Sequence, residues 1–170
     1  MANILVVVDM QNDFIDGALG TPEAVKIVPH VADAIASFRG TVLFTRDTHE
    51  ENYLDTQEGK LLPVKHCIRG TDGWQIRPEL DALRTTEAID KVTFGSSDLP
   101  EILKKENPES VTFMGLCTDI CVISNVILTK AFFPEVPVIV DAAGCAGVTP
   151  ESHKNALAAM KMCQVAVINE

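Results

Sequence analysis

The chain has 170 residues, of which 46% are hydrophobic, and this is enough to form one domain around a sizeable core. Its 24 acidic and 14 basic residues leave a formal charge of −10. This balance excludes nucleic-acid binding and a polybasic membrane anchor, because both depend on lysine and arginine. We find no internal repeat and no linker, so we expect a single domain over residues 1–170.

The cysteines and the N-terminal segment indicate a cytoplasmic protein. The five cysteines are odd in number and form no C-x-x-C pair, which is typical of free thiols in a reducing compartment. Asp9 interrupts the first apolar run and no basic segment precedes that run, so we expect no signal peptide. No apolar run is long enough to span a membrane.

Short apolar, β-branched runs recur along the chain and predict strands. They lie at residues 3–8, 41–45, 87–90, 110–114, 137–140 and 164–168. Continuous apolar runs of this length are typical of strands that are buried on both faces, as in a parallel sheet.

Helical patterns fall between these runs. They cover residues 29–38, 99–106, 119–133 and 150–163. Pro29 fits the first turn of the first helix, and Thr149 followed by Pro150 marks the start of the last one. The third is apolar nearly all round, so we expect it to be buried. Alternating strands and helices predict an α/β domain with a parallel sheet.

Reactive side chains follow four of the predicted strands. Asp9 ends the first strand, Asp47 and His49 follow the second, Lys91 follows the third, and Cys121 comes soon after the fourth. Ligands of open parallel sheets bind just beyond the carboxyl ends of the strands. We therefore expect these side chains to converge on one edge of the sheet.

Cys121 lies where a buried helix begins. The free N–H groups at such a position lower the pKa of a thiol and can hold an oxyanion. Lys91 would favour the thiolate further, and Asp9 would carry a proton from the thiol to a leaving amine. The set predicts acyl transfer from an amide or a similar carbonyl compound. The alternative is that Cys121 is one more small apolar residue of the core.

Four motifs resemble those of the isochorismatase-like cysteine hydrolases. Residues 9–14 (DMQNDF) resemble the D-x-Q-N-D-F opening of that family, and residues 91–96 (KVTFGS) resemble its K-x-x-[FYW]-[GS]-x block. Residues 115–122 (GLCTDICV) match its G-x-x-T-D-x-C-V segment, and residues 66–73 (HCIRGTDG) match an H-C-x-x-G-T-x-G stretch. The motifs come in the family's order and span nearly the whole chain.

The resemblance implies a three-layer α/β/α fold, with a six-stranded parallel sheet, and a catalytic triad of Asp9, Lys91 and Cys121. Cys121 would be the nucleophile and Asp9 the proton carrier, while Lys91 would keep Asp9 ionised. The family also has a cis peptide bond before its T-D-x-C segment, here between Leu116 and Cys117. That bond directs the N–H groups of Cys117 and Cys121 at the developing oxyanion.

Asp47 and His49 resemble the D-x-H metal half-site of the nicotinamidase branch of this family. The resemblance implies that Glu58 and His66 complete the site, with Asp55 as the competitor of Glu58. Two imidazoles and two carboxylates suit zinc, iron or manganese, and we expect zinc. The alternative is that the histidines are polar loop residues that bind no metal.

The metal half-site favours a nicotinamidase, which converts nicotinamide and water to nicotinate and ammonia through a thioester on Cys121. The chain lacks the aromatic residue that this branch often carries before its last metal histidine. Phe14, Phe94 and Trp74 are the candidate pocket walls. An amidohydrolase of N-carbamoyl or ureido compounds remains an alternative, as does a non-hydrolytic thiol or binding protein. The resemblance implies a homo-oligomer that takes a small amide.

Overall fold

The computed structural model describes residues 1–170, and its centre is one six-stranded sheet in which all paired strands run parallel. The strands are β1 (Ala2–Val8), β2 (Thr41–Asp47), β3 (Ile89–Lys91), β4 (Pro108–Leu116), β5 (Val138–Ala146) and β6 (Ala166–Ile168). Their order across the sheet is β3-β2-β1-β4-β5-β6. The first three strands thus form one half of the sheet and the last three form the other half, with β1 and β4 adjacent at the centre.

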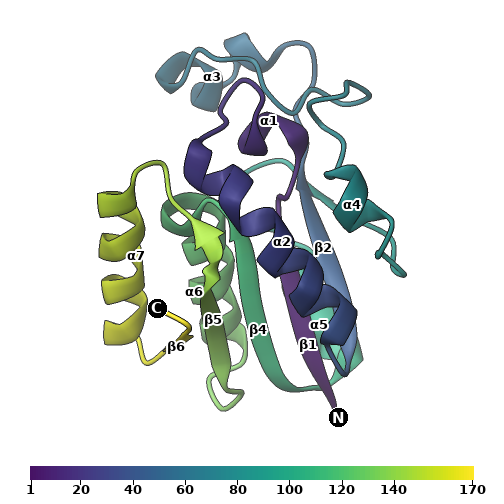
Figure 1. Ribbon diagram of the computed structural model, residues 1–170, viewed down its shortest axis with the longest axis vertical. Helices are drawn as coiled ribbons and strands as arrows, with labels where there is room; N and C mark the ends of the chain where they lie inside the picture. Colours follow the sequence, from purple (N-terminus) through teal and green to yellow (C-terminus); the bar gives the residue numbers. More distant parts are fainter.

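Helices cover both faces of this sheet (Figure 1). On one face α2 (Pro22–Ser37) contacts α4 (Pro78–Asp81). On the other, α5 (Leu99–Glu106) contacts α6 (Ile123–Phe132), which contacts α7 (Pro150–Met162). These layers confirm the expected α/β/α architecture and the parallel sheet.

Short elements lie at the end of the molecule toward which the strands run. They are α1 (Asn12–Ile15), η1 (Tyr53–Asp55), α3 (Gln57–Leu61) and the π-helical turn η2 (Thr118–Val122). In Figure 1, α1 and α3 lie above the carboxyl ends of β1 and β2. The segment between β2 and α4, which breaks the alternation of strands and helices, thus covers the sheet edge where ligands of this architecture bind.

The apolar run of β1 forms the centre of the core. The side chains from Ile4 to Val8 are all fully buried, with β2 paired on one side and β4 on the other. A strand that is covered on both faces needs apolar residues at successive positions rather than at alternate ones. This explains why the sequence pattern identified the strand correctly.

The first long helix begins earlier than predicted. It starts at Pro22 rather than at Pro29, which lies inside it. The hydroxyl of Thr21 accepts a hydrogen bond from the backbone N–H of Ala24, and this cap fixes the first turn. Thr21 and Pro22 therefore mark the start of the helix. Pro29, which has no backbone N–H, removes only one hydrogen-bond donor within it.

The segment predicted as a buried helix over residues 119–133 is less regular and less buried than expected. It opens with the π-helical turn η2 and becomes α-helical at Ile123. Ile127 is 37% exposed and Phe132 is 58% exposed, so the outer face of α6 meets solvent. A helix on the surface of a three-layer fold covers the sheet with one face only, however apolar the other face is.

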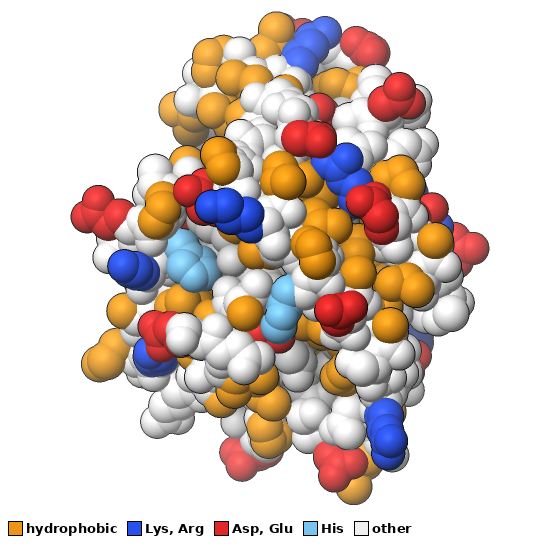
Figure 2. Space-filling view, in the orientation of Figure 1, with side chains coloured by type: hydrophobic (Ala, Val, Ile, Leu, Met, Phe, Trp, Pro, Cys, Tyr) orange, Lys and Arg blue, Asp and Glu red, His pale blue; other side chains and the backbone are white.

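On the face shown in Figure 2, lysine and arginine side chains lie singly among acidic and hydrophobic ones and form no basic patch. None of the helices has both the length and the apolar character that crossing a bilayer requires.

Candidate active site

Asp9 and Lys91 form a buried ion pair at the carboxyl edge of the sheet. Asp9 directly follows β1, and Lys91 is the last residue of β3. The Lys91 Nζ lies 2.7 Å from Oδ2 of Asp9, and neither side chain is more than 1% exposed. The hydroxyl of Thr45 donates to Oδ1 of Asp9 at 2.7 Å. Asp9 has a φ of 48°, a left-handed conformation that aspartate tolerates better than most residues.

The Lys91 ammonium also contacts three other acceptor atoms. It lies 3.2 Å from Oδ1 of Asp47, 2.9 Å from the carbonyl oxygen of Thr93 and 3.5 Å from Sγ of Cys121. Burial opposes its charge, but the negative groups around it, led by Asp9, raise the pKa of Lys91 above its ordinary value. Lys91 is therefore a fixed positive charge between the carboxylates and the sulfur.

Cys121 lies in η2 and is 5% exposed. Burial is the largest influence on its thiol and, together with the charge of Asp9, raises the pKa of Cys121 well above its ordinary value, although Lys91 opposes this shift. From the sequence, the start of a helix and Lys91 were expected to favour the thiolate. Burial and the charge of Asp9 act in the opposite direction and outweigh Lys91, so the thiol is the favoured form.

The backbone before Cys121 has the predicted unusual geometry. The Leu116–Cys117 peptide bond is cis, and Gly115, just before it, has a φ of +124° and lies opposite Val8 of β1. A side chain at position 115 would collide with the backbone of Val8. Burial raises the pKa of the Cys117 thiol to about 12, and the backbone N–H of this residue donates to no acceptor within the protein. This N–H is free to bind a ligand oxygen.

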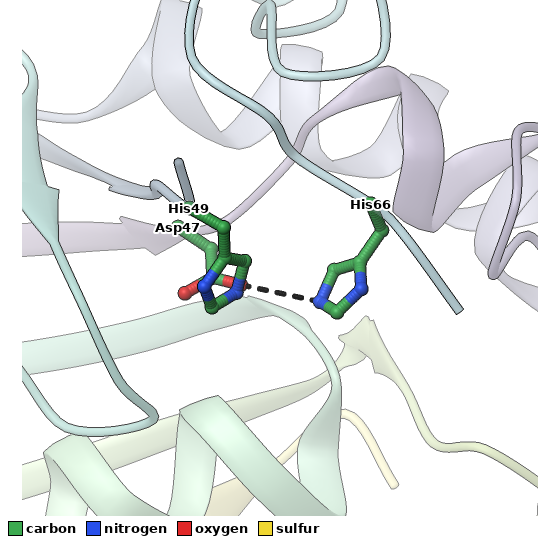
Figure 3. Close-up of side chains that lie close together, drawn as sticks. All are labelled: Asp47, His49 and His66. Atoms are coloured by element: carbon green, nitrogen blue, oxygen red, sulfur yellow. Dashed lines mark hydrogen bonds and ion pairs between the residues drawn. The ribbon is translucent and has the colours of Figure 1, made fainter. Parts of the chain in front are cut away.

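Asp47, His49 and His66 gather beside the ion pair, each offering a ligand atom within 4.8 Å of the others. Asp47 and His49 come from the end of β2, and Figure 3 shows His66 reaching toward them from the covering segment. Oδ2 of Asp47 lies 2.9 Å from Nε2 of His49 and 3.6 Å from Nε2 of His66. All three side chains are buried, and together they can hold a metal ion.

Glu58, in α3, is the fourth member of this group. Its Oε2 lies 3.1 Å from Nε2 of His49 and 4.0 Å from Nε2 of His66. This oxygen is buried and accepts no hydrogen bond, as a ligand atom facing an ion would. Asp55, the competing residue, is exposed in η1. We call Asp47, His49, Glu58 and His66 the donor cluster.

The chemistry of the donor cluster fits a divalent transition metal. The Nδ1 of His66 donates to the carbonyl oxygen of Val64 at 2.8 Å, which leaves Nε2 as the free lone pair facing the cluster. Burial alone would raise the pKa of Asp47, but the neighbouring His49, His66 and Lys91 hold it well below its usual range. Two imidazoles and two carboxylates match the ligand preferences of zinc, iron and manganese.

A cavity of about 220 Å³ adjoins both Cys121 and the donor cluster. Its lining residues are Phe14, Leu19, Thr21, Asp47, Glu58, Leu62, His66, Phe94, Cys117, Ile120, Cys121 and Val148. Cavities for drug-sized ligands measure about 300–1,000 Å³, so this one suits a smaller molecule. Most of the walls are apolar, and no lysine or arginine lines them.

Phe14 and Phe94 belong to the cavity walls, whereas Trp74 does not. The indole N–H of Trp74 donates to the hydroxyl of Thr48 at 2.9 Å, and the guanidinium of Arg46 lies 3.7 Å from the ring centroid. These contacts hold the ring outside the cavity, so the expectation that Trp74 forms a pocket wall is not met.

Two residues of the first motif hold the site together and were missed as functional candidates. Gln11 is fully buried; its amide nitrogen donates to the carbonyl oxygens of Asp47 and Trp74, and its amide oxygen accepts from the N–H of Asp47. The carboxylate of Asp13 accepts from the backbone N–H of Cys67 at 2.8 Å. The presence of three further polar residues in the D-M-Q-N-D-F motif was the available signal.

Asn125 of α6 links the segment after Lys91 to the nucleophile turn. Its amide nitrogen donates to the carbonyl oxygens of Cys121 at 2.8 Å and Phe94 at 3.1 Å, and its oxygen accepts from the N–H of Ser96 at 2.9 Å. The only sequence signal was a polar residue within an apolar helical pattern.

A second contact fixes the start of the same turn from the side of α7. The hydroxyl of Thr118 lies 2.6 Å from Nδ1 of His153. Asp119 accepts from the backbone N–H of Val148, a cavity wall, at 3.2 Å. The η2 turn is therefore held from the α6 side by Asn125 and from the α7 side by these two contacts.

Comparisons with known proteins agree with this geometry. The family model described as the isochorismatase domain matches residues 3–170. A nicotinamidase from Acinetobacter baylyi is 28% identical over 151 residues, which are 69% of this chain and 70% of that protein. The crystal structure of pyrazinamidase of Pyrococcus horikoshii in complex with zinc has a TM-score of 0.84 at 27% identity, with 99% of each chain covered.

An amidase of a different substrate class has a similar structure. N-carbamoylsarcosine amidase from Thermoplasma acidophilum has a TM-score of 0.80 at 26% identity, with 98% of this chain and 95% of that chain covered. The similar proteins therefore include more than one substrate class, whereas the family model matches nearly the whole sequence. The chain belongs to the isochorismatase family.

Proposed function

We propose that this protein is a metal-dependent amidohydrolase that converts nicotinamide and water to nicotinate and ammonia. The observation that carries the proposal is that Cys121 and three members of the donor cluster, Asp47, Glu58 and His66, line the same small, mostly apolar cavity. Nicotinamide has an electrophilic carboxamide carbon for the thiol and, at the meta position of the ring, a nitrogen lone pair for a metal ion. The similarity to nicotinamidases and pyrazinamidases supports this assignment.

The reaction begins with transfer of the Cys121 proton to the carboxylate of Asp9. Because the resting group is a thiol, this step needs a base, and Asp9 shares the Lys91 ammonium with the sulfur. Burial raises the pKa of Asp9, while the charge of Lys91 opposes that shift. Burial therefore makes Asp9 a stronger base than an exposed aspartate, and Lys91 stabilises the negative charge that moves to the sulfur.

The thiolate then attacks the carboxamide carbon, and the electron pair of the carbonyl double bond moves to the oxygen. The N–H groups of Cys117 and Cys121 stabilise this oxyanion. The C–N bond breaks as the nitrogen takes the proton from Asp9, and ammonia leaves. Asp9 next removes a proton from water, which attacks the thioester and releases the acid, while the sulfur regains its proton.

Asp47, His49, Glu58 and His66 would hold the metal ion. When bound, the ion supplies a Lewis acid for the ring nitrogen of the substrate. The cavity walls Phe14 and Phe94 exclude water from the ring and keep its amide next to the sulfur. These residues therefore orient the substrate, while the triad carries out the acyl chemistry.

An amidase of N-carbamoyl compounds is the second candidate, favoured by the structural similarity to N-carbamoylsarcosine amidase. The substrate of that enzyme carries a carboxylate, which needs a positive partner when it is buried. No lysine or arginine lines the cavity, and its charged walls are Asp47 and Glu58. The charge of the cavity therefore favours a neutral amide.

The test measures ammonia release from nicotinamide and from N-carbamoylsarcosine by the purified protein, together with its metal content. We expect release from nicotinamide, loss of this activity on chelation, and recovery when zinc, iron or manganese is added back. Cys163→Ser changes an exposed thiol far from the cavity and is the control for Cys121→Ala. Release from N-carbamoylsarcosine alone, unaffected by chelation, would contradict the proposal.

A further inference from the structure

A groove of about 560 Å³ adjoins the active-site cavity. Glu58, Leu62, Phe94 and Ile120 line both spaces, so the groove and the cavity adjoin at these residues. Ile120 directly precedes Cys121 in η2. The groove therefore begins next to the residues that surround the reacting sulfur.

The outer walls of this groove are large apolar side chains that meet water. Leu61, at the end of α3, is 81% exposed, and Val92, directly after β3, is 77% exposed. Leu62 and Phe94, at the junction with the cavity, are 40% and 44% exposed. Isolated exposed apolar residues are ordinary, but four of them around one hollow form a patch whose burial by a ligand is favourable.

The polar groups of the groove add little binding capacity for a charged ligand. No lysine or arginine lines it. The hydroxyl of Thr56 already donates to the carbonyl oxygen of Tyr53 and accepts from the N–H of Gly59. Glu58 faces His49 of the donor cluster. The ligand that fits these walls is therefore neutral and apolar.

We propose that the apolar half of this groove, formed by Leu61, Leu62, Val92, Phe94 and Ile120, is a second subsite that binds a neutral apolar substituent on the ring of the substrate amide. The proposal rests on the proposed function, in which Cys121 attacks a carboxamide. The preferred substrate is then a ring-substituted heteroaromatic amide larger than nicotinamide. A substituent of the substrate is favoured over a second copy of the chain because the groove shares four lining residues with the cavity beside the reacting sulfur.

The experiment measures binding to the Cys121→Ala protein by titration calorimetry, so that it does not depend on turnover. The probes are nicotinamide and nicotinamides that carry a butyl group at ring position 5 or 6. Each methylene that becomes fully buried strengthens binding about fourfold, so a half-buried butyl group should bind about tenfold tighter at one of the two positions. Equal or weaker binding at both positions would overturn the proposal.

Variants of the outer walls show where the butyl group binds. In the Cys121→Ala protein, Leu61→Ser and Val92→Ser together should reduce the butyl advantage from about tenfold to about twofold. Val25→Ser is the matched control, because Val25 is also an exposed valine, 47% exposed, but lies on α2 outside the groove. An advantage that survives the double substitution would rule out the groove as the binding site.

Two further measurements separate the possible failures. If the double substitution dissociates an oligomer in sedimentation experiments and leaves the butyl advantage unchanged, the groove is a contact between copies of the chain and the subsite is excluded. Ammonia release is measured separately on the protein with Cys121 intact. Absence of release from all the amides would refute the proposed function, whereas release without a butyl advantage would refute the subsite alone.

Discussion

Replacing Asn125 by leucine should weaken both the fold and the active site. Asn125 is fully buried, and its amide binds the carbonyl oxygens of Cys121 and Phe94 and the N–H of Ser96. Leucine has a similar volume and can replace none of these hydrogen bonds. The substitution therefore leaves the polar backbone groups in place but removes their partner.

The expected loss follows from the burial of those groups. Ser96 is 1% exposed, so its N–H loses its acceptor without gaining water, at a cost of about 2 kcal/mol. The carbonyl oxygen of Phe94 is only half-buried and adds about 1 kcal/mol. We expect the free energy of unfolding to fall by about 3 kcal/mol. A shift of about 1 Å between Lys91 and Cys121, now 3.5 Å apart, would also lower kcat about a hundredfold.

Thr129→Val provides a matched control on the same helix. Thr129 lies one turn beyond Asn125 and is equally buried, but its hydroxyl has no hydrogen-bond partner. Removing it should raise the free energy of unfolding by about 1 kcal/mol and leave kcat unchanged. Urea unfolding with constant m values measures both changes. A loss below about 1 kcal/mol for Asn125→Leu, or an equal loss in both variants, would refute this reasoning.

Three further predictions concern single side chains. Cys121→Ala should abolish ammonia release, whereas Cys117→Ala should keep most of it, because only the backbone N–H of Cys117 takes part; equal losses would contradict the assigned nucleophile. Glu58→Gln should lower zinc affinity at least about tenfold in chelator competition, and Asp55→Asn should not; the reverse result would make Asp55 the ligand. Burial lowers the pKa of His153, so the unfolded chain binds that proton first and stability falls as the pH drops through the ordinary value of 6.5. Urea unfolding from about pH 7 to about pH 5 should show a smaller fall for His153→Gln; an unchanged fall would contradict this.

The features that were predictable from the sequence depend on patterns along the chain. The apolar run of β1 signals a strand that is covered on both faces, and the parallel topology brings the residues after β1, β2, β3 and β4 to one edge. Asp9, Asp47 and Cys121 do each lie within contact distance of the Lys91 Nζ. The separation of these residues in sequence was no obstacle, because each lies at or shortly after the carboxyl end of a recognisable strand.

The features that were not predictable depend on tertiary contacts. Whether Trp74 faces the cavity is decided by Arg46 and Thr48, which lie on another segment of the chain. The protonation of Cys121 is set by its burial, which a local pattern of residues does not reveal. Gln11 and Asn125 bind backbone groups of distant segments, and such acceptors exist at every residue, so no side-chain pattern marks the partner.

The donor cluster and the triad share one carboxylate and are not independent sites. Asp47 directs Oδ1 toward Lys91, at 3.2 Å, and Oδ2 toward His49, at 2.9 Å. Asp9 and Asp47 flank the ammonium of Lys91, and Glu58 faces His49, so the site holds three carboxylates and one lysine. In a buried site, excess negative charge is costly unless a proton or a cation balances it. The histidines of the donor cluster face the carboxylate oxygens that carry this charge. Removing the Asp47 carboxylate therefore removes a metal ligand and a partner of Lys91 together.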